Sequence, residues 1–127
     1  RVGYRQLTPG LRCVNDPQSD HYNSITEDLD FRDWKSAERM IRLDDMYRWL
    51  IVVDHNTDNP EPGRGSCVFI HLRKGKNTPT ERGTALSKSD FEFLLSWMDL
   101  TNNPLLIQMP KAAYEHVKGL WNLPDLR

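Results

Sequence analysis

The 127-residue sequence has no excess of one charge and no long apolar run. Its 17 lysine and arginine residues stand against 18 aspartate and glutamate residues, which leaves a formal net charge of −1. Such a balance creates no long-range field that would recruit nucleic acid or an anionic membrane. No apolar segment approaches the roughly 18–20 residues that a bilayer span requires. We therefore expect neither a nucleic-acid partner nor a membrane span.

Cysteine is also scarce, with Cys13 and Cys67 the only two in the sequence. They could form one disulfide in an oxidising compartment, but two cysteines are too few to indicate the compartment. The residue type of Cys67 suits a small buried apolar side chain, which is the interpretation we favour. Three histidines, His21, His55 and His116, lack acidic or cysteine partners at metal-ligand spacing. The sequence therefore predicts no metal site and no cofactor.

The length suits one domain, residues 1–127, because domains usually hold about 100–150 residues. The chain begins with Arg1, and its first residues do not form a secretory leader, so we expect a mature or trimmed piece.

Local patterns predict a mostly β domain with flanking helices, an α+β fold. After an extended entry and irregular loop over residues 1–23, mixed spacing at 34–47 indicates one or two short helical turns. Apolar runs predict strands at 49–53, 66–72 and 105–109. An amphipathic helix should follow the N-cap Ser87, and a last helix should run from Pro110 to Lys118 with Gly119 as its C-cap.

One stretch carries chemistry. His71 ends a predicted strand, a place where a lone histidine is more often structural than catalytic. Around it the sequence reads Pro62-Gly63-Arg64-Gly65-Ser66-Cys67-Val68-Phe69-Ile70-His71, and then Pro79-Thr80-Glu81-Arg82-Gly83-Thr84-Ala85-Leu86-Ser87. This resembles the active-site stretch of bacterial L,D-transpeptidases, in which a Gly-Ser-x-x-Phe-x-His strand leads to Pro-Thr-x-Gly-Cys-x-Ala-Leu-Ser.

The resemblance extends over nearly the whole chain. Further matching positions are Gln6-Leu7-Thr8-Pro9, Cys13-Val14-Asn15-Asp16-Pro17, Tyr22-Asn23, Ser36-Ala37-Glu38-Arg39, Tyr47, Val52-Val53 and Asn56. Because Cys13 matches a family position, the resemblance implies a structural or disulfide-bonded cysteine there. It also implies an L,D-transpeptidase-like β-sandwich whose N-terminal strands are missing. We therefore expect a complementing N-terminal segment or self-association, because unpaired strand edges invite association.

The resemblance further implies a mechanism. In this family a cysteine thiolate attacks the carbonyl after the diamino acid of a peptidoglycan stem peptide, D-alanine leaves, and a histidine takes the thiol proton. That proton-accepting role falls on His71, whereas the nucleophile position is Gly83, which has no side chain. Arg82 also replaces a family glycine and puts the loop conformation in question. Cys67 does not substitute, because it lies four positions before His71 on the same predicted strand, a distance of roughly 13 Å.

Two functional hypotheses follow from the resemblance. The first is an L,D-transpeptidase or L,D-carboxypeptidase domain that is inactive as written because its nucleophile is lost. The alternative is a non-catalytic module that binds cell-wall peptides or a protein partner, and a fragment without activity is a third possibility. By resemblance, the substrate-binding positions are Asn56, Gly65, Ser66, Thr80, Arg82 and Thr84. Stem peptides would be the partners, in a periplasmic or extracytoplasmic location.

Overall fold

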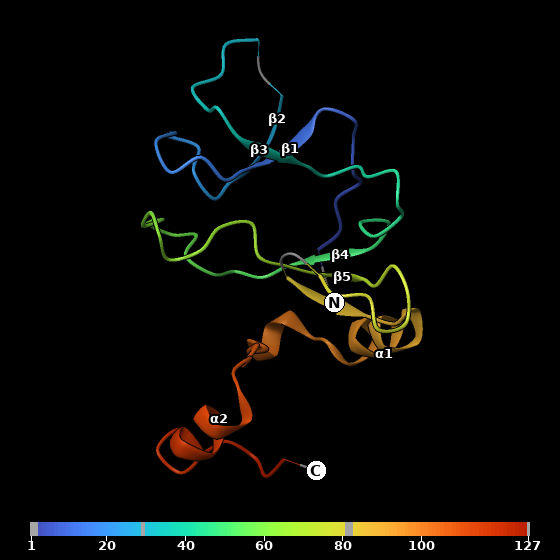
Figure 1. Cartoon of the computed structure of the whole chain (residues 1–127), viewed down its shortest axis with the longest axis vertical. Coiled ribbons are helices and arrows are strands. Elements are labelled where there is room, and N and C mark those ends of the chain that lie inside the picture. Colours follow the sequence, from blue (N-terminus) through green and yellow to red (C-terminus); the bar gives the residue numbers. More distant parts are fainter. Residues whose placement is uncertain (1–2, 29, 81–82, 127) are drawn as a thin grey trace.

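The computed structural model describes residues 3–28, 30–80 and 83–126. Over these residues the chain is a small α+β protein with two three-stranded sheets and two α-helices (Figure 1). The described part contains no helix that is long and apolar enough to cross a membrane.

The first sheet has the order β2-β1-β3 and is antiparallel throughout. Its strands are β1 (Leu11–Val14), β2 (Ile25–Glu27) and β3 (Ala37–Arg39). The predicted helical turns at 34–47 are therefore wrong, and β1 also interrupts the predicted irregular entry. Both errors have one cause: these short segments satisfy their backbone groups by pairing across the sheet, with Val14 opposite Ala37. The local pattern of apolar residues in these segments does not predict this pairing.

The second sheet has the order β4-β5-β6, with β4 (Leu50–Val52) antiparallel and β6 (Thr84–Leu86) parallel to the central β5 (Phe69–Leu72). The predicted strand at 49–53 is confirmed. The strand predicted at 66–72 begins only at Phe69, because Cys67 has a left-handed backbone with φ of 53°. Cys67 thus lies outside the strand that carries His71.

The helices follow the second sheet. Helix α1 (Lys88–Trp97) begins as predicted, with the Ser87 hydroxyl accepting a hydrogen bond from the Asp90 backbone N–H. Helix α2 (Lys111–Val117) follows Pro110 as predicted, but its C-cap is Lys118 and not Gly119. A one-turn 3-10 helix, η1 (Leu100–Asn102), lies between them.

The strand predicted at 105–109 is wrong. These residues have no regular structure, and Leu105 is 84% exposed. Figure 1 shows the segment leading toward α2, and its link to Thr84 of β6 is a side-chain hydrogen bond from Thr84 to Gln108, not backbone pairing. A run of apolar residues without a pairing partner does not form a strand.

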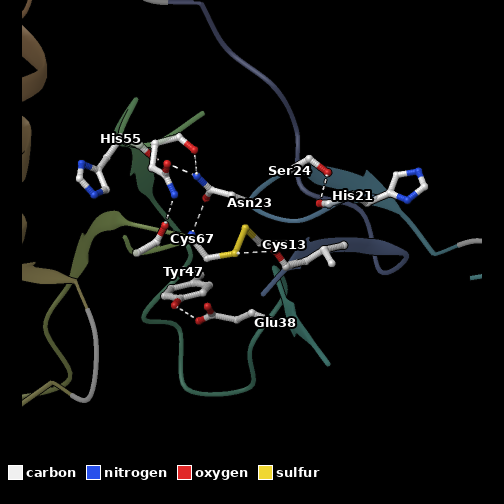
Figure 2. The surroundings of a disulfide bond; sticks show 11 residues. Cys13, His21, Asn23, Ser24, Glu38, Tyr47, His55 and Cys67 are labelled. Atoms are coloured by element: carbon white, nitrogen blue, oxygen red, sulfur yellow. Dashed lines mark hydrogen bonds between the residues drawn. A yellow bond between two sulfur atoms is a disulfide. The ribbon is translucent and has the colours of Figure 1, made fainter. Parts of the chain in front are cut away.

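A disulfide between Cys13 and Cys67 joins the two sheets through the core. It links β1 to the segment before β5, and both cysteines are buried (Figure 2). Leu11, Met40, Tyr47 and Phe69 pack around it as the main hydrophobic cluster. The burial predicted for Cys67 is confirmed, and the disulfide with Cys13, which the sequence left open, is present.

Candidate functional site

His71 lies on β5 and is almost completely buried, with 1% of its surface exposed. Its Nδ1 is 2.9 Å from the Leu72 carbonyl oxygen. A carbonyl oxygen only accepts hydrogen bonds, so a neutral ring that makes this contact carries its proton on Nδ1. Nε2 is then the unprotonated nitrogen, which is the state that a general base requires.

Gly83 lies directly against this imidazole. It precedes β6, whose Thr84 pairs with Ile70 of β5 in parallel register. A Cβ atom added at Gly83 would lie 3.4 Å from Cδ2 of His71, the ring carbon bonded to Nε2. A side chain at this position would therefore begin beside the edge of the ring that carries Cδ2 and Nε2.

With the present backbone conformation, however, there is no room for a side chain at Gly83. The added Cβ would also lie 2.5 Å from the Phe69 carbonyl oxygen, and Gly83 has a φ of +74°. L-residues resist that conformation, so a side chain here requires a shift of the β5–β6 backbone. Arg82, where the resemblance raised the same question, lies outside the described residues.

A cavity of about 390 Å³ opens beside His71 between the two sheets. The first sheet and the loop after it contribute Asn15, Glu38, Arg42, Asp44, Met46 and Tyr47. The second sheet and its loops contribute His71, Lys74, Thr78, Pro79, Thr80 and Ala85. Because the walls come from both sheets, the disulfide that joins the sheets also holds the cavity together.

Charged groups of both signs line this cavity. Arg42 donates two hydrogen bonds to Asp44, at 3.0 and 2.7 Å, and this pairing lowers the pKa of the Asp44 carboxyl to about 2. The Arg42 guanidinium also lies 5.2 Å from the centre of the Tyr47 ring. Lys74 adds a second positive charge to the wall.

Tyr47 connects Glu38 with His71. Its hydroxyl donates a hydrogen bond to Glu38 Oε1 (Figure 2), and its ring centre is 5.5 Å from that of His71. Burial, followed by the hydrogen bond to Glu38, raises the pKa of the Tyr47 hydroxyl above its usual value. The tyrosine therefore remains a neutral donor throughout the physiological range.

Three of the predicted substrate-binding residues shape a loop and do not line the cavity. Asn56 donates to the carbonyls of Glu61 and Gly65 and accepts from the Glu61 N–H. Gly65 has a φ of +99°, and Ser66 follows it before the disulfide. Asn23 fastens this loop to the first sheet by donating to the Asn56 carbonyl and accepting from the Cys67 N–H (Figure 2).

The other two described members of that set lie close to Gly83. Thr80 lines the cavity, and its hydroxyl donates to the Gly83 carbonyl at 3.3 Å. Thr84 instead donates to the Gln108 side chain at 2.7 Å. The structure thus brings His71, Gly83 and Thr80 together and leaves Asn56, Gly65 and Ser66 in a supporting loop.

Sequence reasoning missed the wall that contains Glu38, Arg42 and Asp44. These residues fell within the segment interpreted as helical turns. A usable signal was present, because Glu38 and Tyr47 both belong to the stretches that carry the family resemblance. Their side chains meet only because β3 and the following loop fold over the second sheet.

We also considered catalysis by a free cysteine thiolate and a site for a metal ion. Both cysteines are consumed in the disulfide, so neither supplies a thiolate. Across residues 3–28, 30–80 and 83–126, no group of three or more His, Cys, Asp or Glu side chains is placed to hold a metal ion.

Comparisons with protein-family models, with curated proteins and with solved structures find no match for this chain.

Proposed function

We propose that this chain is an L,D-transpeptidase-like domain that binds peptidoglycan stem peptides in the cavity beside His71 without forming an acyl-enzyme. The two sheets joined by the disulfide would correspond to part of the family's β-sandwich. The chain would act outside the cytoplasm, where its substrate lies and where a buried disulfide such as Cys13–Cys67 persists.

The observation that carries the proposal is the contact between Gly83 and His71. The resemblance pairs these positions as nucleophile and base from sequence spacing alone. A Cβ added at Gly83 would lie 3.4 Å from Cδ2 of the His71 ring, and this proximity supports the proposal. The parallel pairing of β5 with β6, in which Ile70 lies opposite Thr84, explains why the two positions lie side by side.

The residues present support binding more than turnover. Glycine offers no atom to form a thioester, so the covalent route of the family is closed. What remains is a cavity with a cation at Lys74, suited to a peptide carboxylate, and with the polar groups of His71 and Thr80. The cavity therefore keeps groups that can bind a peptide, although it lacks the nucleophile that would cleave it.

A titration followed by nuclear magnetic resonance tests this function. A stem tetrapeptide that contains a diamino acid and ends in D-alanine should shift backbone signals of residues lining the cavity, among them Lys74 and Thr80. The variant Lys74→Ala should weaken binding, whereas the matched control Lys76→Ala should not, because Lys76 belongs to the same turn but does not line the cavity. No signal change at millimolar peptide, or changes confined to residues away from the cavity, would contradict the proposal.

A further inference from the structure

One of the two Glu38 carboxylate oxygens has a hydrogen-bond partner, and the other does not. Oε1 accepts the Tyr47 hydroxyl, while Oε2 is buried and has no hydrogen-bond partner. Oε2 is the one buried side-chain nitrogen or oxygen of the described residues found in this condition. A buried polar atom without a partner costs free energy, and the cost is larger for a charged group. Glu38 is therefore a place where an incoming hydrogen-bond donor gains more than it would from water.

The residues around Glu38 do not remove this deficit. Arg42 is near enough for its charge to interact with the carboxylate, but its guanidinium donates hydrogen bonds to Asp44. Tyr47 supplies one donor, and that donor already serves Oε1. Glu38 nevertheless belongs to the wall of a cavity large enough for a ligand.

The carboxylate has the freedom to present its second oxygen to that space. Its two oxygens are equivalent acceptors, and torsion about the terminal bond of a glutamate side chain is broad. A combined change in the side-chain torsions that pivots the carboxylate about the oxygen held by the Tyr47 hydroxyl would move the other oxygen toward the cavity. Figure 2 shows Glu38 and Tyr47 directed at each other below the disulfide, the arrangement from which this change starts.

We propose that Glu38 is a specificity-determining residue, which accepts a hydrogen bond from an ammonium group of the ligand in the cavity. This inference rests on the proposed function, and it assigns the free side-chain ammonium of the stem peptide's diamino acid to Glu38. An ammonium group carries three donors and a positive charge, so it satisfies the carboxylate better than a neutral donor does. Ligands with an amine should thus be preferred over ligands of the same shape without one.

Two peptides that differ at one position measure this preference on the unaltered chain. One stem tetrapeptide carries lysine as its third residue, and the other carries norleucine, which keeps the aliphatic chain and lacks the ammonium. Because hydrogen bonds to charged groups are stronger than those between neutral groups, we expect the lysine peptide to bind at least about tenfold more tightly.

The variant Glu38→Gln assigns the preference to this residue. Its amide oxygen still accepts from Tyr47, but the second position becomes an NH2 donor that repels an ammonium. The tenfold preference should disappear in Glu38→Gln and persist in Glu92→Gln, a matched change on the exposed face of α1.

The possible results separate this inference from the proposed function. Equal binding of the two peptides to the unaltered chain would overturn the role of Glu38 while leaving stem-peptide binding intact. Preserved preference in Glu38→Gln would also overturn it. Failure of both peptides to bind would instead refute the proposed function, and the role of Glu38 with it.

Discussion

Removing the disulfide is the perturbation whose effect on stability can be worked out most directly. Cys13 and Cys67 are 54 positions apart, and closing a loop of that length lowers the entropy of the unfolded chain by about 14 cal/mol/K. At room temperature this corresponds to about 4 kcal/mol of folding stability. Small domains have total stabilities of only about 5–15 kcal/mol, so the double variant Cys13→Ala/Cys67→Ala should be close to its stability limit.

The location of the disulfide adds a functional consequence. It fastens β1 to the segment before β5, and the cavity walls come from the two sheets that these elements belong to. Its loss should therefore loosen the cavity along with the core. Peptide binding should weaken in the double variant even under conditions where most molecules remain folded.

Urea denaturation followed by tryptophan fluorescence measures the effect on stability. With a slope of about 1–3 kcal/mol/M, a loss of about 4 kcal/mol lowers the urea midpoint by about 1–4 M. The parent chain treated with a thiol reductant should show the same decrease, which separates the loss of the bond from the effect of the substitutions. A decrease in stability below about 1 kcal/mol in both samples would refute the reasoning.

Other parts of the structure yield further predictions. Phe91 is the only buried residue of α1, so Phe91→Ala should lower the free energy of unfolding by about 3–5 kcal/mol, and exposed Phe93→Ala should change it far less; urea denaturation decides. The Asp44 carboxyl has a pKa of about 2 in the folded chain against 3.8 for the free side chain, so its stabilisation is present above pH 3.8 and is lost as the pH falls toward 2. Asp44→Asn should therefore flatten the stability curve over that range, and an unchanged curve would contradict the pairing with Arg42. Among the described residues, each outer strand pairs with a neighbour on one side only, so light scattering should show self-association of the 127-residue chain or its association with a complementing segment. A stable, cooperatively unfolding monomer would contradict this.

The elements that sequence predicted well are those with local signals. The start of α1 was predictable because the Ser87 side chain caps a helix only three residues away, and α2 because Pro110 suits the first turn. The strand around Ile51 was predictable from β-branched and aromatic residues in a short run.

The elements that sequence missed depend on distant partners. Strand β3 exists because β1 pairs with it, whereas the apolar run from Leu105 to Met109 is not a strand because it forms no backbone pairing with a described strand. Neither fact is written in the local spacing of apolar residues. The disulfide belongs to the same class, since pairing of Cys13 with Cys67 depends on how the two sheets meet.

The residues of the candidate site likewise fall into those that a local motif predicts and those that only the fold brings in. His71, Gly83 and Thr80 were accessible from sequence because they lie in one contiguous motif. Glu38 and Arg42 reach the cavity from another sheet, so only the folded chain reveals that they share a wall with His71. The loop formed by Asn56 and Gly65 illustrates the reverse case, in which motif residues act through structure and do not line the cavity.

The most direct test of the central claim, that Gly83 and His71 occupy the family's nucleophile and base positions, is mass spectrometry of Gly83→Cys after incubation with a carbapenem. Carbapenems acylate the cysteine of the family that this chain resembles, and both native cysteines are blocked in the disulfide. Because the added Cβ presses on the Phe69 carbonyl, Gly83→Ala serves as the control for strain, and both variants are first checked for cooperative unfolding. We predict one acyl adduct on folded Gly83→Cys, none on the parent chain or Gly83→Ala, and a large loss of acylation in Gly83→Cys/His71→Ala. A folded Gly83→Cys that remains unmodified, or one that is acylated equally without His71, would contradict the assignment of this pair.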